Sequence, residues 1–300
     1  MYLLLSFFSL VLMSFFIPTS VFGGFTGSDT YSTNLRIHIG EDISHMIKTP
    51  FDTSTLWTNA TYAHTRDTSS NSPNATSSYS GTIGADQLVD KWMLGFSGGG
   101  DTAIVKNTFS PYTKTHNRMG IFQPYISYAL RNYLTLFSAL GITRTYGNAI
   151  KHSASSHAHT HTTTYFGTGG ILVGLPSLSD TLFPTFRILS TYTLSKTNSY
   201  QWESTSYAAV RSHMATLDPA LRLTFTALKG STPYIEYAPY WIIDRSKSIS
   251  QEPKDMGQAW RIGSSIHLNH AQALHLSYTY ETLTTPGDHN SFTVRFSYAF

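Results

Sequence analysis

Three histidines at alternate positions, His157, His159 and His161, have the side-chain type and spacing of a metal site. In an extended strand, alternate side chains point to the same side, so the three imidazoles would share one face and could bind zinc or copper. The chain contains no cysteine, and no acidic residue lies close to these histidines in sequence. We therefore predict no metal and no cofactor, and we interpret His157 and His159 as part of a polar surface loop.

A second group of reactive side chains is the run Asp288-His289-Asn290-Ser291. Serine, histidine and asparagine are the groups of a hydrolase site. Consecutive residues of a strand point alternately to opposite sides, however, and cannot all face one another. We predict a loop at the rim of the fold here and no enzymatic activity, and we keep a membrane hydrolase as the weakest alternative.

Charged and titratable residues recur at alternate positions of strand-like segments in the second half of the chain. They are predicted to face a polar lumen, because an unpaired charge that faces hydrocarbon is costly. Cross-lumen ion pairs of purely structural value and an ion-selective pore both remain open as explanations. The residues are Arg187, Arg222, Glu236, Arg261, His267, His275, Glu281 and Arg295.

The last residues of the chain alternate between large apolar and small or polar side chains. The apolar set is Phe292, Val294, Phe296, Tyr298 and Phe300. A period of two predicts a strand with one apolar face, and an exposed edge of this kind invites aggregation in a soluble protein. In a membrane barrel, one face of the strand would meet lipid, the other would meet a polar lumen, and the first strand would cover the edge.

About twelve segments show strand character between Thr55 and Phe300. The connections after the even-numbered segments look short, and those after the odd-numbered segments look longer and polar, as in Gly147–Thr160. This sorting predicts an all-β fold, a twelve-stranded antiparallel transmembrane barrel with both ends on the periplasmic side. The expected strands are Leu56–Thr65, Tyr79–Asp86, Lys91–Thr102, Arg118–Ala129, Tyr133–Tyr146, His161–Val173, Phe183–Ser195, Val210–Ala227, Thr232–Ile243, Gln258–Leu268, Leu274–Thr282 and Phe292–Phe300.

The N-terminal region predicts export. Residues 2–17 are almost wholly apolar but too few to span a bilayer as a helix, which is typical of a signal peptide over residues 1–23 with cleavage before Gly24. In the following leader, residues 24–54, Ile39, Ile43, Met46 and Ile47 fall on one helical face. We expect a short helix there, in or near the lumen, ahead of a barrel domain over residues 55–300.

The composition of the 300 residues agrees with this class: 12% are charged, 41% are hydrophobic, and Tyr, Phe and Trp number 19, 18 and 5. Such aromatic content is typical of the girdles of a membrane barrel. The net charge of +3 without a basic run argues against nucleic-acid binding, and the lack of cysteine excludes a disulfide framework.

Several stretches resemble the autotransporter β-domain, the translocator of type V secretion. They are Trp57 after the predicted helix, the Gly-rich hairpin of Tyr79–Asp86 and Trp92–Gly98, the Pro-Tyr-rich Thr232–Tyr240, and the Phe300 ending. The resemblance covers about residues 35–300 and implies a monomer in the bacterial outer membrane, exported by the Sec translocon. It also implies that the barrel-assembly machinery reads the terminal strand.

Two features depart from that family. Only Gly24 to about Lys48 is present where a large passenger is expected, and the Asn-Asn pair at which some members cleave themselves does not occur. The predicted function is a translocator that anchors or exports a segment across the outer membrane. A passive diffusion pore is the alternative.

Overall fold

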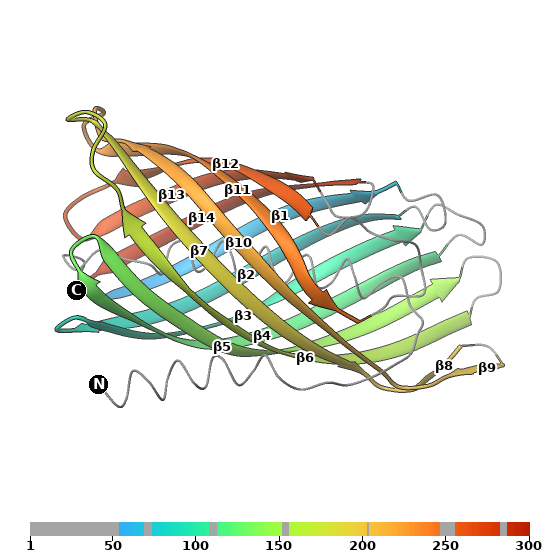
Figure 1. Cartoon of the computed structure of the whole chain (residues 1–300). Helices are drawn as coiled ribbons and strands as arrows, with labels where there is room; N and C mark the ends of the chain where they lie inside the picture. The colour runs from blue at the N-terminus through green and yellow to red at the C-terminus, as the bar shows by residue number, and fades with distance from the viewer. Residues whose placement is uncertain are drawn as a thin grey trace.

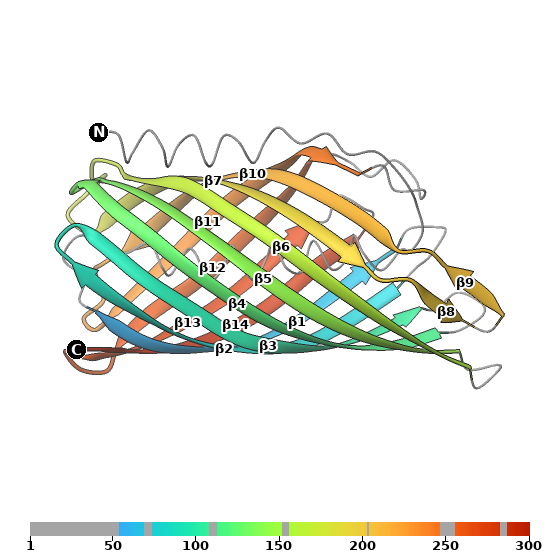
Figure 2. The same cartoon turned by 90° about the horizontal axis from the view of Figure 1, so that it is seen from below.

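Twelve strands close into one antiparallel barrel (Figures 1 and 2). The computed structural model describes residues 54–68, 74–107, 113–151, 156–202, 204–246, 256–282 and 287–300. The predicted signal peptide at residues 1–23 and the predicted helix at residues 24–54 lie outside these ranges, Ser54 apart. No helix in the described ranges is long and apolar enough to cross a membrane.

Each barrel strand pairs with its neighbour along the chain, and β1 pairs with β14 to close the ring. The predicted all-β fold of twelve antiparallel strands is confirmed, each expected segment matching one barrel strand. The barrel strands are β1 (Thr55–Asp67), β2 (Asn74–Val89), β3 (Trp92–Asn107), β4 (Thr113–Arg131), β5 (Leu134–Lys151), β6 (Ser156–Gly174), β7 (Leu182–Thr197), β10 (Val210–Phe225), β11 (Ser231–Arg245), β12 (Met256–His267), β13 (Gln272–Thr282) and β14 (Gly287–Ala299).

The connection from β7 to β10 contains a separate hairpin of β8 (Tyr200–Trp202) and β9 (Thr205–Tyr207). The rings of Tyr200 and Tyr207 stack across it with centroids 4.8 Å apart. Burial raises the pKa of the Tyr200 hydroxyl above its ordinary value, and the neighbouring Tyr207 adds to the effect. In Figure 1 the hairpin projects beyond the barrel at the end opposite the C-terminus.

Side chains alternate between the two sides of the wall along most of each strand, with register shifts at Ala215/Thr216 and Ala129/Arg131. In β1, for example, Thr61 and Trp57 are buried inside, whereas Leu56 and Tyr62 are exposed outside. The exposed large apolar residues form a continuous belt because their rows pass from strand to strand: Tyr62 lies opposite both Tyr79 and Phe292. An exposed apolar surface of this extent requires an apolar environment around the barrel.

The strands run further than the sequence predicted at the end opposite the C-terminus. The expected polar loop Gly147–Thr160 is wrong, because β5 continues to Lys151 and β6 begins at Ser156. Polar side chains such as those of serine, threonine and histidine do not interrupt backbone pairing where the wall faces water on both sides. A run of polar residues therefore indicates where the apolar belt ends, but not where the strand ends.

Both ends of the barrel domain lie together. The backbone N–H of Phe300 donates to the carbonyl of Ser54 at 3.0 Å, and the turns after β2, β4, β6, β10 and β12 surround this end (Figure 1). The expected placement of both ends on the side of these turns therefore agrees with the structure.

Large rings lie flat against the inner wall where a neighbouring strand presents a glycine. The Trp57 ring lies over Gly84, the Tyr125 ring over Gly95, and Phe166 over Gly141. A Cβ built on Gly141 would lie 2.1 Å from Phe166 Cζ, which is far inside van der Waals contact. These glycines allow the buried cluster of Trp57, Met93, Tyr125, Phe137, Ala139, Phe166 and Leu189 to cover the inside of one half of the barrel.

We expect Gly141→Ala to destabilise the barrel by about 1–3 kcal/mol, because the added methyl group must displace the Phe166 ring in a packed cluster. Gly120→Ala is the matched control, since a Cβ there meets nothing within 4 Å. Urea unfolding of barrels refolded in detergent would measure both variants. Equal stability of the two variants would contradict the prediction and show that the Phe166 ring can move aside without cost.

Candidate functional site: the barrel interior

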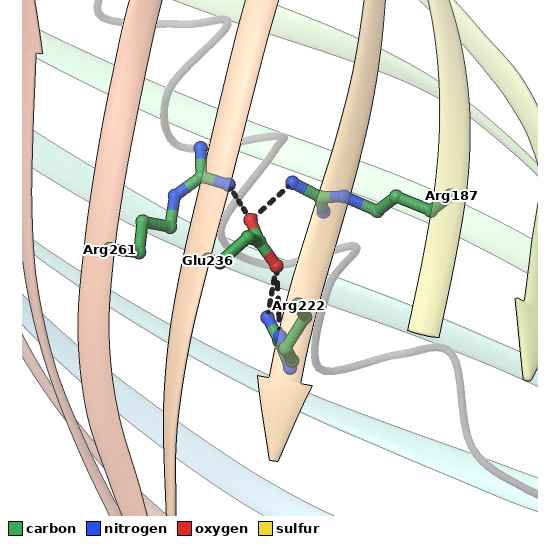
Figure 3. A network of polar contacts seen from close by, with 4 residues as sticks. All are labelled: Arg187, Arg222, Glu236 and Arg261. Carbon is green, nitrogen blue, oxygen red and sulfur yellow. Dashed lines mark hydrogen bonds and ion pairs between the residues drawn. The ribbon is translucent and has the colours of Figure 1, made fainter. Parts of the chain in front are cut away.

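One carboxylate, that of Glu236 on β11, binds three guanidinium groups inside the barrel (Figure 3). Arg187 Nη2 donates to Oε1 at 2.8 Å, and Arg222 donates to Oε2 through Nε and Nη2, both at 2.8 Å. Arg261 Nη1 donates to Oε1 as well. We call these four residues the Glu236 cluster.

Strand register positions the Glu236 cluster. Arg222 of β10 and Arg261 of β12 are the direct cross-strand partners of Glu236. Arg187 belongs to β7, one strand further away, and lies opposite the buried Ala220 of β10. The small Ala220 leaves room for the Arg187 side chain to extend past β10, so Glu236 links four consecutive strands (Figure 3).

The Glu236 cluster carries an excess of positive charge. The Glu236 side chain is 1% exposed and that of Arg187 5%, so neither ion is solvated by bulk water. Charge-assisted hydrogen bonds to both carboxylate oxygens compensate the lost hydration. Asp218, inward-facing on β10 and bonded by Thr216 Oγ1 at 2.8 Å, adds a second negative charge on the same part of the wall.

The Glu236 cluster stands beside an interruption of the β10–β11 ladder. Leu217 pairs with Trp241 and Leu221 with Tyr237, in one unbroken register, and Pro219 lies opposite Pro239 between them. Proline has no N–H group, so neither residue can donate the hydrogen bond that a ladder requires at this point. The Arg222–Glu236 ion pair therefore joins β10 and β11 close to the point where the ladder between them is interrupted.

A second polar chain lies near the end that carries Phe300. The Arg295 guanidinium lies 4.1 Å from the centre of the Trp57 ring, and Trp57 Nε1 donates to the Tyr125 hydroxyl at 3.3 Å. Tyr125 donates in turn to Asp86 Oδ2 at 3.1 Å, and the Thr55 N–H donates to Asp86 Oδ1 at 3.2 Å. The chain connects β14, β1, β4 and β2 across the closing seam of the barrel.

The remaining residues predicted for the lumen have different surroundings. Glu281 and Arg295 are buried on the inner side, and the His275 ring lies within hydrogen-bond distance of Ser265 (2.7 Å) and Ser297 (3.2 Å). His267 has the inner parity but is exposed at the last position of β12.

The two reactive-looking runs are both strand segments. His157, His159 and His161 are exposed on the outer side of β6, and no group of three or more potential metal ligands occurs within the described ranges. The predicted rim loop at Asp288–Ser291 is wrong, because these residues belong to β14. His289 and Ser291 are buried inside, whereas Asn290 bonds to Asp288 on the other side of the strand, so the wall separates the groups of the imagined hydrolase site.

The predicted set of lumen residues did not include Asp86, Tyr125 or Asp218. The strand parity that identified Arg222 and Glu236 would have found all three, because each lies at an inward position of its strand. Parity does not predict the hydrogen bond from Tyr125 of β4 to Asp86 of β2, because this bond passes across β3.

Comparison with known proteins rests on the fold. The sequence matches no protein-family model and no curated protein. The NalP autotransporter translocator domain of Neisseria meningitidis superposes with a TM-score of 0.77 at 10% identity, over 91% of this chain and 98% of that one. The β-domain of the Bordetella autotransporter BrkA superposes with a TM-score of 0.61 at 15% identity, over 83% of this chain and 100% of that one.

The transport unit of the autotransporter AIDA-I from Escherichia coli gives a TM-score of 0.56 at 12% identity, over 83% and 90% of the chains. The chain thus has the fold of autotransporter translocator domains, an outer-membrane barrel fold.

We expect Glu236→Ala to destabilise the barrel by about 3–5 kcal/mol, because it leaves three arginines without their shared carboxylate inside the wall. Asp244→Ala is the control: its side chain is 64% exposed and pairs with His213 at 3.2 Å, so less than about 1 kcal/mol should be lost. Urea unfolding in detergent would measure both. Similar losses for the two variants would mean that the Glu236 cluster is dispensable.

Proposed function

We propose that this chain is an outer-membrane translocator that anchors or exports the segment preceding β1. The observation that carries the proposal is the closed twelve-stranded barrel whose first and last strands begin and end at the same rim. A segment entering from that rim is delivered directly to the mouth of the barrel. The likeness to the NalP translocator domain over nearly its whole length supports the same assignment.

The membrane in this proposal is the bacterial outer membrane. The continuous apolar belt on the outside and the polar interior are the two surfaces that such a barrel needs. The apolar segment at residues 2–17 supports export by the Sec translocon through a cleaved signal peptide, and the terminal aromatic strand supports insertion by the barrel-assembly machinery. We propose that the barrel works as a monomer.

The interior offers hydrogen bonds rather than catalytic groups. Threonine and serine hydroxyls occupy many inward positions. Such groups suit the backbone of a polypeptide in transit. Since the hydrolase-like run is split across the wall, the proposal includes no enzymatic activity.

A reporter fused after Gly24 tests the proposal. We expect a small epitope tag at this position to become accessible to antibody and to added protease on intact cells, because the barrel would carry it to the surface. The matched control places the same tag between Asn132 and Tyr133, in the turn after β4, where it should stay protected. If the tag after Gly24 remains periplasmic while small solutes leak into the cell, the translocator proposal is wrong and a diffusion pore is the better interpretation.

The last residue provides a separate prediction about assembly. Phe300 is 71% exposed, on the outer side with Tyr298 and Phe296, and does not belong to the buried cluster. A charge at the membrane interface should cost only about 0–1 kcal/mol. We therefore expect Phe300→Asp to lower insertion in cells strongly while barrels refolded in detergent keep nearly their full stability.

Heat-modifiable gel mobility of membrane fractions and of refolded protein would measure the two effects of Phe300→Asp. Phe122→Asp, on the outer side of β4, serves as a comparison that should harm both readouts. Parallel losses for Phe300→Asp would make Phe300 an ordinary strand residue.

A further inference from the structure

The outer side of the barrel is strongly basic over β3 to β7 at the rim opposite the C-terminus. These five strands contain a single acidic residue, Asp101, and it has the inner parity. Nine outward side chains near the rim are cationic or imidazole groups, interspersed with neutral ones such as Ile104 and Asn148. We call these nine the wall patch: Lys106, Lys114, Arg118, Arg144 and Lys196, with His116, His157, His159 and His161.

Strand register brings the wall patch together. We count the rows of outward positions from the rim. The first row joins Lys106 to Lys114 and continues to His157, and the third row joins Arg118 to His161 by way of Tyr146. The fourth row contains Arg144 and Lys196 and continues to Arg211 of β10. Adjacent rows of one strand are two residues apart, so the charges lie within a few side-chain lengths of one another.

The stagger of the strands brings these rows to a common level. The row through Trp92, the first residue of β3, reaches β7 at Ile188, well inside that strand. Rows therefore climb toward the far rim from β3 to β7. Lys106 belongs to the first row and Lys196 to the fourth. Because of the stagger, the two residues lie closer together along the barrel axis than three rows of separation would imply.

Within the described ranges, no acidic side chain neutralises the cations of the wall patch. None of the five lysines and arginines forms an ion pair with a described residue. The other half of the rim differs, because Arg66 lies opposite Asp288 and His213 pairs with Asp244. A merely solvated surface would be expected to carry both signs of charge, as that half does.

The apolar belt begins directly below the wall patch. The fifth row contains Phe122, Ile142, Tyr165 and Leu194, of which Phe122 and Tyr165 are more than half exposed. A molecule bound here would meet apolar side chains on one side and cations on the other. That combination fits an amphiphile with an anionic head.

We propose that the wall patch binds the anionic phosphate headgroups of lipids in the outer leaflet of the membrane. The proposal rests on the proposed function only in that the barrel must span an outer membrane with this rim outward. Lysine and arginine near an anionic lipid surface each contribute measurably to binding, and guanidinium groups hold phosphate in bidentate geometry. The acyl chains of the same lipids would cover the fifth row.

Native mass spectrometry of the full-length barrel in detergent, titrated with phosphatidylglycerol or with phosphatidylcholine of the same acyl chains, tests the proposal. We expect tighter binding of phosphatidylglycerol, weakening as salt is added, because exposed charges are screened. The triple variant Lys114→Gln, Arg118→Gln, Arg144→Gln should weaken phosphatidylglycerol binding at least about tenfold.

The matched control is Lys91→Gln, Arg131→Gln, Lys229→Gln, which removes the same charge at the opposite rim, at the turns after β2, β4 and β10. It should bind phosphatidylglycerol like the unchanged chain. Equal weakening of both triple variants, or equal binding of the two lipids, would overturn the proposal. Displacement of the lipid by inorganic phosphate at the same concentration would also overturn it, in favour of a free-anion site. A failed surface display would leave this titration unaffected, since it needs only the folded barrel.

Discussion

Closure of the sheet between β1 and β14 is the constraint on which the rest of the structure depends. An apolar environment offers no partner to a free N–H or carbonyl group, so a sheet within it can have no open edge. The register from Thr55 opposite Ala299 to Asp67 opposite Gly287 removes the edge over the whole of β1. Once the ring is closed, the parity of each strand decides which side chains meet the interior and which form the apolar belt.

The Glu236 cluster adds side-chain bonding where backbone bonding is incomplete. Pro219 and Pro239 face each other in the β10–β11 seam, and the cluster ties β7, β10, β11 and β12 together beside them. It also fixes register, because a slip of one residue would turn Glu236 toward the apolar belt and leave the arginines inside. The Glu236 cluster therefore contributes to the choice of register as much as to the stability of the barrel, since the cost of burying the ions offsets a large part of their attraction.

Strand number and parity were predictable because alternation is a local property of the sequence. The inward position of Arg222, Glu236 and Arg261 followed from it directly. Strand ends were not predictable from polarity: the histidines of β6 continue the ladder beyond the apolar belt. Nor was the Arg187–Glu236 pair, which joins strands separated by the β8–β9 hairpin and requires the small Ala220 between them. Contacts of this kind depend on stagger, which no single segment encodes.

The hydrogen bond between Thr61 and Thr293 joins residues 232 positions apart, whereas every other seam of the barrel joins strands that are neighbours along the chain or flank one hairpin. Loop-closure entropy opposes such a long-range contact until the intervening strands have paired. The order of events in folding is therefore built into the topology: local hairpins come first and the ring closes last. Until β14 pairs with β1, the growing sheet keeps two open edges. The unpaired backbone groups of these edges therefore stay exposed until all twelve barrel strands have formed.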